Sequence, residues 1–396
     1  MFGKIKQLFL LVLLAVTVIS YLDVFNSYDE SIYVSSSLSN YILILTVICF
    51  LLNFSINCLS NKYIKMASIF LFVIALNTAI TMAFFNTSTY VGDLKNIAIP
   101  FVAVCIGYNM DINRKFLMFI YYMYGILLLA VSASLISNNI GGLVIVDTYQ
   151  IASKNALGVM ISSYVAIVLP ILLVDNIKRP IKYFFIALCA MFFIVLLTIR
   201  ARASTMTFFF TIAIFIVEVL RHGGETHSRA ARKIVVIGVL LLIAIPILST
   251  VFEPLGTYIH NSLFQNVEDD VTTGRMDRNV VAINFISDHL FLGRLTTPTS
   301  YEWIHNYVLR VLAEYGIFFS AILIILYFYL VIKVLVRILR KNPLSANCIG
   351  YWALLPPIML SLIEPLFPYG PGTSVLLAYI LLGYSLKQEA TGCFEW

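Results

Sequence analysis

The stretch that sets the organisation of this chain contains Thr272-Thr273-Gly274-Arg275-Met276-Asp277-Arg278, then Asp288-His289-Leu290-Phe291-Leu292-Gly293-Arg294, then His305-Asn306. These phrases lie between about 252 and 316, in the only long polar stretch of a chain otherwise made of apolar runs. Most side chains capable of chemistry lie in this stretch or in short loops that can fold back onto it. The stretch therefore separates a long apolar scaffold before it from a shorter apolar segment after it.

The composition is that of an integral membrane protein. Apolar residues make up 61% of the chain and charged residues 12%, whereas soluble domains have about 45–50% and 25%. The net charge of +6 arises largely from lysines and arginines in short loops between apolar runs. Membrane topology explains basic residues in such loops, and we expect no nucleic-acid partner.

About twelve apolar runs are long enough to cross the roughly 30 Å of bilayer hydrocarbon as helices. They are 7–24, 40–59, 66–85, 95–110, 117–136, 156–174, 183–199, 204–220, 234–252, 307–336, 348–365 and 371–386. Lys4 and Lys6 precede the first run, as in a signal peptide, but no small-residue cleavage site follows, so we keep this run as a span. The sequence therefore predicts an all-α membrane protein of about twelve transmembrane helices.

The distribution of basic residues predicts the orientation of these spans. With both termini in the cytoplasm, all but eight of the 26 lysines and arginines fall on the cytoplasmic side. The eight on the other side are Lys95, Lys154, Arg200, Arg202, Arg275, Arg278, Arg294 and Arg310. The polar stretch is then a long periplasmic loop between spans nine and ten. We divide one membrane domain into a nine-span scaffold (1–252), this loop with an amphipathic helix over 279–292 (253–306), and a three-span segment (307–396).

Four arginines on the predicted outer side are candidates for binding an anion. Arg200 and Arg202 lie in a turn between two apolar runs, where they either reach lipid phosphates or clamp a substrate phosphate. Arg275 and Arg278 have the i, i+3 spacing that puts them on one face of a helix, with a preceding threonine as its cap. A helix start with two arginines suits an anion, and a solvated face paired with nearby acids is the alternative.

His305 is the candidate proton acceptor. It lies beside Asn306 at a predicted outer edge of the membrane, and histidine changes its charge close to neutral pH. A purely structural role for His305 is the alternative, and His289 and His260 are the competing histidines of the loop.

Two acidic residues complete the set of candidates. Glu314 follows Arg310 by four positions, a spacing that predicts an ion pair on one helix. Glu364 lies in a turn rich in proline and glycine between the last two spans, where we expect it to face the external cavity or to pair with an arginine. Other acids on the outer side, such as Asp23 and Glu30, lack the dense spacing of metal ligands, so we expect no metal.

Several phrases follow one another in a recognisable order: Thr198-Ile199-Arg200-Ala201-Arg202, Thr273-Gly274-Arg275, Asp288-His289-Leu290-Phe291-Leu292-Gly293, His305-Asn306 and Glu314-Tyr315-Gly316. In this order the chain resembles the bacterial O-antigen polymerase and O-antigen ligase superfamily, most strongly over about 195–320. The span count and the ending Glu364-Pro365-Leu366-Phe367-Pro368 resemble the polymerase branch more than the ligase branch. A second glycine usual after Gly293 is missing here. Either Arg200 or Arg202 is the counterpart of the first family arginine, and Arg202-Ala203-Ser204 is the better match.

This resemblance implies a glycosyltransferase that needs no metal and no cofactor, in the inner membrane of a bacterium. The donor would be an oligosaccharide repeat unit on undecaprenyl diphosphate within the membrane lipid, and the acceptor another lipid-linked repeat unit at the periplasmic face. A chain-length regulator protein would be a partner.

The resemblance also implies roles for single residues. Arg202 and Arg275 would neutralise the diphosphate leaving group, with Arg200 and Arg278 beside them, and His305 would activate the acceptor hydroxyl. The supporting residues would be Asn306, Glu314 and Glu364.

Other functions remain open from the sequence. An O-antigen ligase, which transfers the glycan to lipid A-core, shares the donor and the motifs and differs only in its acceptor. A flippase or transporter for the same lipid-linked sugar would need ionisable residues in mid-span, whereas most charges here lie at span ends. A metal-dependent glycosyltransferase would have to use Asp23 and Glu30 in the first outer loop.

Overall fold

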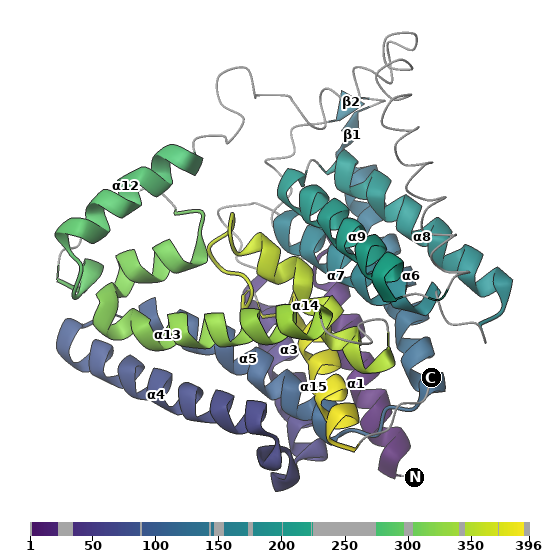
Figure 1. The fold of residues 1–396 in the computed structure, drawn as a ribbon, viewed down its shortest axis with the longest axis horizontal. Helices are drawn as coiled ribbons and strands as arrows, with labels where there is room; N and C mark the ends of the chain where they lie inside the picture. The colour runs from purple at the N-terminus through teal and green to yellow at the C-terminus, as the bar shows by residue number, and fades with distance from the viewer. Residues whose placement is uncertain are drawn as a thin grey trace.

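The computed structural model describes residues 2–22, 35–87, 89–141, 144–145, 154–172, 177–199, 201–222, 224, 275–296, 304–339, 345–370 and 372–391. Within these residues the regular secondary structure is helical apart from one pair of two-residue antiparallel strands (Figure 1). The elements in order are α1 (Phe2–Ile19), α3 (Ser35–Asn53), η1 (Ile56–Ser60), α4 (Lys62–Phe85), α5 (Thr89–Asn109), α6 (Arg114–Asn139), β1 (Ile140–Gly141), β2 (Val144–Ile145), α7 (Lys154–Leu172), α8 (Arg179–Thr198), α9 (Arg202–His222), α12 (Arg275–Asp288), η3 (Gly293–Leu295), α13 (Tyr307–Leu339), η4 (Ala346–Cys348), α14 (Ile349–Leu360) and α15 (Leu376–Thr391).

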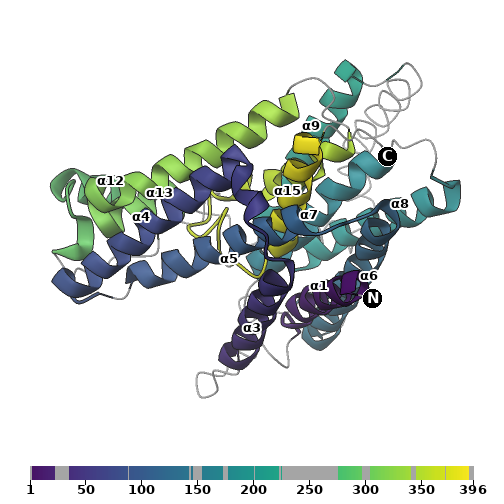
Figure 2. The ribbon, with the colours of Figure 1, turned by 90° about the horizontal axis from the view of Figure 1, so that it is seen from below.

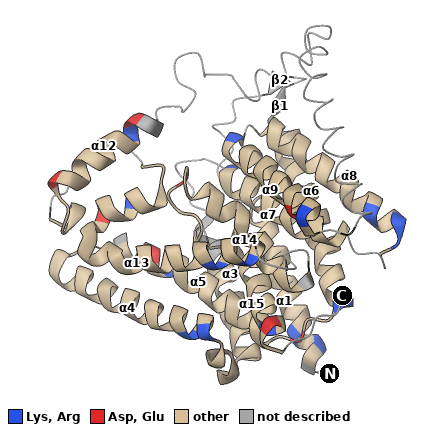
Figure 3. Cartoon of the chain, viewed as in Figure 1, with Lys and Arg blue, Asp and Glu red and all other residues tan. Residues whose placement is uncertain are grey.

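Seven of the described helices are long and apolar enough to cross a membrane. They are α4, α5 from Tyr90, α6 as far as Ser137, α7, α8, α9 and α13. Charged residues gather near helix ends: α4 carries none from Met66 to its end at Phe85, and Figure 3 shows similar uncharged lengths in other helices. The prediction of a helical protein embedded in a membrane is confirmed.

Four further predicted spans, at 7–24, 40–59, 348–365 and 371–386, overlap α1, α3, α14 and α15, whose bounds differ from the predicted ones by several residues and which are not among the seven. The ninth predicted span, 234–252, lies outside the described residues. The total of twelve spans therefore stays a prediction.

The centre of the molecule is formed by α7, α14 and the first part of α15, as far as Leu386, which are buried along nearly their whole length. α15 packs along α5 and α14, and α14 packs along α7. Glycines permit these close approaches, because a methyl group at Gly383 would meet the backbone of Val104, and one at Gly350 would meet the backbone of Leu381. Small residues of this kind let helix backbones come into contact inside membranes.

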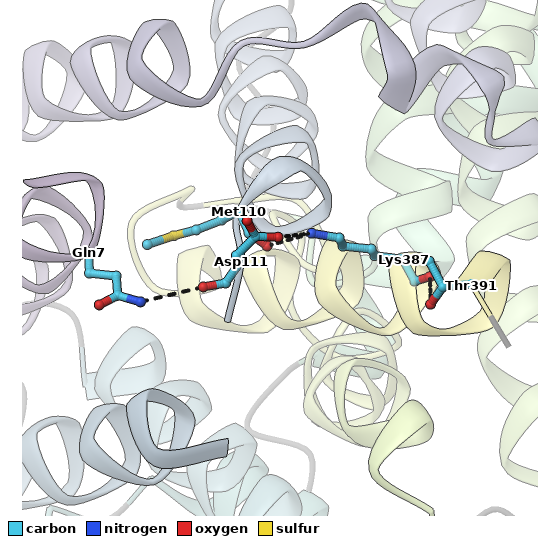
Figure 4. Close-up of polar contacts among 5 residues, drawn as sticks. All are labelled: Gln7, Met110, Asp111, Lys387 and Thr391. Carbon is cyan, nitrogen blue, oxygen red and sulfur yellow. Dashed lines mark hydrogen bonds and ion pairs between the residues drawn. The ribbon is translucent and has the colours of Figure 1, made fainter. Parts of the chain in front are cut away.

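Several helices come together at one end of the molecule, which we call the basic end. It is defined by two ion pairs, Lys387 with Asp111 and Arg337 with Glu389. Lys387 near the end of α15 pairs with Asp111, just after α5, at 2.6 Å, and Gln7 of α1 lies 3.5 Å from the backbone carbonyl of Asp111 (Figure 4). Arg337 of α13 pairs with Glu389 of α15 at 2.7 Å. The basic end thus joins α1, α5, α13 and α15.

A second group of contacts, which we call the site end, joins the starts of α5, α7, α9 and α13 and the segment between α14 and α15. Tyr21, just after α1, lies 3.1 Å from the hydroxyl of Thr373 in that segment. At the site end, Asp93, Asn155, Arg202 and His305 come from predicted outer loops, and at the basic end Asp111, Arg337 and Lys387 come from predicted cytoplasmic segments. Which end faces the cytoplasm stays a prediction.

Candidate functional site

His305 and Arg278 lie in contact at the site end. Nη1 of Arg278 is 3.1 Å from Nε2 of His305, and both side chains are half-buried. A guanidinium group carries donors only, so Nε2 of His305 accepts this hydrogen bond, and the proton of the neutral ring is on Nδ1. The two residues are 27 positions apart in the chain, and they meet because α12 folds back against α13.

The start of α13 fixes the backbone around His305. Oδ1 of Asn306 accepts a hydrogen bond from the N–H of Leu309 at 3.0 Å, as an N-cap residue does. Nδ2 of Asn306 donates to the carbonyl of Leu362 at 3.1 Å, and the N–H of Tyr307 donates to the carbonyl of Ser361 at 3.0 Å. Asn306 therefore ties the start of α13 to the segment that follows α14.

The helix α12 brings Arg278 to His305. The predicted loop helix over 279–292 is present but runs over Arg275–Asp288, so that Arg275 and Arg278 lie in its first turns. Figures 1 and 2 show α12 beside the first part of α13, at one end of the layer formed with α4 and α5. Ala282 of α12 is buried together with Ile304 and Ala313.

A break in α13 creates the surface on which this loop rests. Gly316 has φ 60° and ψ 179°, a conformation open essentially to glycine alone. The helix therefore consists of two arms, which Figure 1 shows as a bend. The N–H groups of Ile317 and Phe318 lose their helical partners at the break, and they donate to the carbonyls of Leu290 at 2.8 Å and Phe291 at 3.3 Å.

Gly293 lies in the segment after α12 that packs against the break in α13, and we call this contact the glycine joint. Gly293 also has a positive φ of 55°, and a methyl group there would lie 2.6 Å from the backbone nitrogen of Gly316 and 2.5 Å from the carbonyl oxygen of Ala313. The segments around Gly293 and Gly316 thus pack against each other. Their glycines have a structural role, which holds α12 on α13 and so keeps Arg278 near His305.

Arg310 and Glu314 have different partners from those predicted. Arg310 pairs with Asp93 of α5, and Tyr315 donates a hydrogen bond to the other oxygen of Asp93 at 2.6 Å. Glu314 instead pairs with Arg294 of the loop at 3.2 Å. The predicted Arg310–Glu314 pair is therefore wrong, because each residue finds a partner on another element.

Glu364 is buried and accepts a hydrogen bond from Nδ2 of Asn155, at the start of α7, at 2.9 Å. This bond links the segment between α14 and α15 to α7. Asn306, the residue after His305, bonds the carbonyl of Leu362 in the same segment, two residues before Glu364.

Arg202 is the first residue of α9 and is half-buried. The start of α9 packs on α7, where Gly158 leaves room for the side chain of Ser204, and Ser162 donates to the Ser204 carbonyl at 3.2 Å. Arg202 therefore begins the helix that packs beside the α7 start carrying Asn155.

Some of the candidate residues predicted from the sequence are not among the residues that the structure describes. Arg200 is not among the described residues, and neither are His260, Asp23 and Glu30. Arg275 starts α12, but its side chain is not described. His289 is described: its ring stacks on Phe285 at 4.5 Å, with Nδ1 3.3 Å from the Phe285 carbonyl.

Sequence reasoning missed Asp93 and Asn155. Asp93 is 5% exposed and stands in the first turns of α5, which begins at Thr89 rather than at the predicted 95. The sequence did carry a signal for Asp93, because its carboxylate comes just before an apolar run. An acidic side chain at the edge of the membrane needs a partner. Asn155 gave no comparable signal.

At the described site end a guanidinium, a group suited to binding an anion, lies beside an imidazole, a group that can accept a proton. Arg278 offers a cation with several donors beside a neutral imidazole, while the acid of Asp93 is already balanced by Arg310. Comparison of the chain with protein-family models and with curated proteins gives no match.

Proposed function

We propose that this protein is a bacterial inner-membrane glycosyltransferase that polymerises oligosaccharide repeat units. The donor is a repeat unit on undecaprenyl diphosphate, and the acceptor is a hydroxyl of another lipid-linked unit. The product is a longer lipid-linked glycan of the kind used in lipopolysaccharide, and a chain-length regulator is the expected protein partner.

The observation that supports this proposal most is the contact of His305 with Arg278 at the site end. The resemblance in sequence assigned His305 to the acceptor and Arg275, with Arg278 beside it, to the leaving group, and a transfer reaction requires both functions at one place. The contacts of Asn306 and Glu364 tie the starts of α7 and α13 to the segment after α14. The start of α9, with Arg202, packs on α7 beside them.

The proposed step joins the acceptor oxygen to the anomeric carbon of the donor. The bond between that carbon and the diphosphate oxygen breaks, and its electron pair leaves with the diphosphate. The proton of the acceptor hydroxyl passes to His305, and Arg202 and Arg275 stabilise the charge that grows on the diphosphate. No metal is part of this step.

The proposal includes a topology of twelve spans with both termini in the cytoplasm. The site end is then periplasmic, where lipid-linked repeat units are presented, and the basic end is cytoplasmic. The lysines and arginines of the basic end follow the excess of basic residues found in cytoplasmic loops.

A glycan ladder on a gel tests the proposed function. A null strain is complemented with wild type, Arg202→Ala, Arg275→Ala or His305→Ala at matched protein levels. We expect each substitution to collapse the ladder to core plus one repeat unit. The loss of one charge-stabilising donor costs about 3 kcal/mol, or roughly a hundredfold in rate.

Arg337→Ala is the matched control, because it removes an arginine from an ion pair at the basic end, and its ladder should be normal. Normal ladders from all three site variants would contradict the proposal. Polymer that accumulates on the carrier lipid while the core stays bare would instead identify an O-antigen ligase.

A further inference from the structure

We propose that the ammonium group of Lys333 binds the headgroup phosphate of an anionic phospholipid, in the membrane leaflet at the basic end. The site lies between the last turns of α13 and the first turn of α4. Lys333 and His305 lie near opposite ends of α13, so this lipid site is separate from the candidate functional site. The inference does not depend on the proposed glycosyl transfer.

The first observation is the position of Lys333 along α13. It is the first charged residue of this helix after Glu314, and the residues between them are apolar apart from serine, tyrosine and glycine. The second arm of α13, 317–339, is about 34 Å long, slightly more than the roughly 30 Å of bilayer hydrocarbon. Lys333 lies about 9 Å before the end of this arm, close to the boundary between acyl chains and headgroups.

The second observation is that aromatic rings hold the ammonium group in place. Nζ of Lys333 lies over the ring of Tyr63, 5.3 Å from its centroid, where the negative face of the ring attracts a cation. Tyr63 is buried in the first turn of α4 and stacks on Tyr329 of α13, with centroids 5.5 Å apart. Figures 1 and 2 show α4 and α13 side by side. A cation that is ordered before its ligand arrives loses less entropy on binding.

The third observation is that no carboxylate among the described residues lies within ion-pair distance of Lys333. The two neighbouring cations of the basic end do have such partners, since Arg337 pairs with Glu389 and Lys387 with Asp111. The segment 340–344, which follows α13 and lies outside the described residues, contains no acid. An ionised side chain at the membrane edge needs a counter-ion, and the neutral ring of Tyr63 does not supply one.

The electrostatic field around Lys333 favours a ligand with net negative charge. Lys62 and Lys65 are exposed in the first turn of α4, and the N-terminal end of α4 adds the positive end of its helix dipole. Glu389 of α15, which acts electrostatically on Lys333, is already paired with Arg337. This field attracts an anionic headgroup, whereas the cationic group of a zwitterionic lipid is repelled.

The apolar surface beside Lys333 favours a phospholipid over a soluble anion. Ile332 and Val336 of α13 and Ile69 of α4 are exposed, and on membrane-spanning helices such side chains contact acyl chains. A phospholipid brings a phosphate and acyl chains to the depth where Lys333 and this apolar surface meet. A free phosphate would have to give up water at an apolar boundary. Basic sites between membrane helices bind anionic headgroups in this way.

Native mass spectrometry of the full chain in detergent tests the inference, with phosphatidylglycerol and phosphatidylcholine of identical acyl chains as the probes. In wild type we expect the first phosphatidylglycerol to bind at least about fivefold more tightly than the first phosphatidylcholine. Lys333→Met removes the ammonium group and keeps most of the stem. It should weaken the first phosphatidylglycerol about fivefold, the effect of one basic residue beside a headgroup, and change phosphatidylcholine much less.

Two further variants serve as controls. Lys333→Arg keeps the cation and should keep the preference for phosphatidylglycerol. Lys115→Met is the matched control, because Lys115 is exposed at the start of α6 on the same predicted side of the membrane, and it should bind both lipids as wild type does. Excess inorganic phosphate should not displace phosphatidylglycerol from wild type, since the acyl chains also hold the lipid. The unfolding midpoint of each variant in phosphatidylcholine checks that it is folded.

Equal affinities of wild type for the two lipids would overturn the inference, as would a Lys333→Met variant that binds phosphatidylglycerol like wild type. An equal loss in Lys115→Met would also overturn it, because the attraction would then come from surface charge in general. Displacement by inorganic phosphate would show an anion site that does not select a lipid. If Lys333→Met does not fold, Lys333→Gln takes its place in the same comparison, with the same expected loss.

Discussion

Asp93 carries a buried charge at the site end. It is 5% exposed, and it receives Arg310 on one oxygen and the hydroxyl of Tyr315 on the other. A buried ion pair is weak evidence of net stabilisation, but removal of one partner leaves the other charge buried without compensation. The pair thus constrains the first arm of α13, which follows His305, against α5.

Asp93→Asn should therefore destabilise the folded protein by about 3–5 kcal/mol, because it leaves the guanidinium of Arg310 buried and unbalanced. The double variant Asp93→Asn/Arg310→Met should recover most of this loss. Unfolding in mixed detergent micelles, followed by tryptophan fluorescence across the double-mutant cycle, measures both values.

Asp111→Asn is the control for this substitution, since Asp111 is fully exposed and pairs with Lys387 at the surface. It should have little effect, as is usual for surface pairs. Equal losses for Asp93→Asn and Asp111→Asn, or additive losses in the double variant, would show that the buried pair is not coupled.

Single residues also show where sequence reasoning reached its limit. The spacing of Arg310 and Glu314 predicted a helical pair, but such pairs contribute only about 0.2–0.5 kcal/mol. The carboxylate of Asp93, which lies 217 positions away, offers a stronger partner, and no local pattern reveals a contact of that length. The contact of Arg278 with His305 was hidden for the same reason, although the sequence had marked both residues.

At the scale of elements, the contact between the segments around Gly293 and Gly316 determines where α12 lies. Gly316 interrupts α13, and the two N–H groups that follow bond the carbonyls of Leu290 and Phe291. The sequence indicated a helix in the loop and a span from 307. It gave no sign that this span is broken, because the φ of a glycine is set by its tertiary surroundings.

Gly316→Ala should weaken the contact between α13 and the segment after α12, including the hydrogen bonds from Ile317 and Phe318. The φ of 60° with ψ 179° costs an L-residue about 1–3 kcal/mol, and the added methyl group would meet the backbone of Phe291. Hydrogen exchange measured by mass spectrometry should show faster exchange at Ile317 and Phe318 and in peptides that cover α12.

Gly92→Ala is the matched control, because a methyl group at Gly92 in α5 has nothing within 4 Å. Exchange in this variant should equal that of wild type. Unchanged exchange in Gly316→Ala would mean that the break does not hold the loop.

At the scale of the whole molecule, the helices connect two ends of different character. The class of fold followed from composition and apolar runs, since only helices or closed barrels satisfy backbone groups in lipid. Seven long apolar helices agree with it. The closeness of α5 to α15 could not be read from the sequence, because it depends on glycines meeting the backbone of a distant helix.

Labelling of single introduced cysteines tests the proposed orientation. In a background in which all six native cysteines are replaced by serine, we expect Asn284→Cys, exposed on α12, to react with an impermeant maleimide in intact spheroplasts. Thr391→Cys at the end of α15 should react only after the membrane is opened. The reverse pattern would invert the topology and place His305 in the cytoplasm.

The most direct test of the central proposal is transfer by the purified protein. The full chain in nanodiscs receives only an undecaprenyl-diphosphate-linked repeat unit, and the lipid-linked products are separated by length. We predict that wild type makes lipid-linked glycans of two or more units, and that His305→Ala makes none while remaining folded. Absence of any elongation by wild type, or product that forms only when lipid A-core is added, would contradict the proposed polymerase.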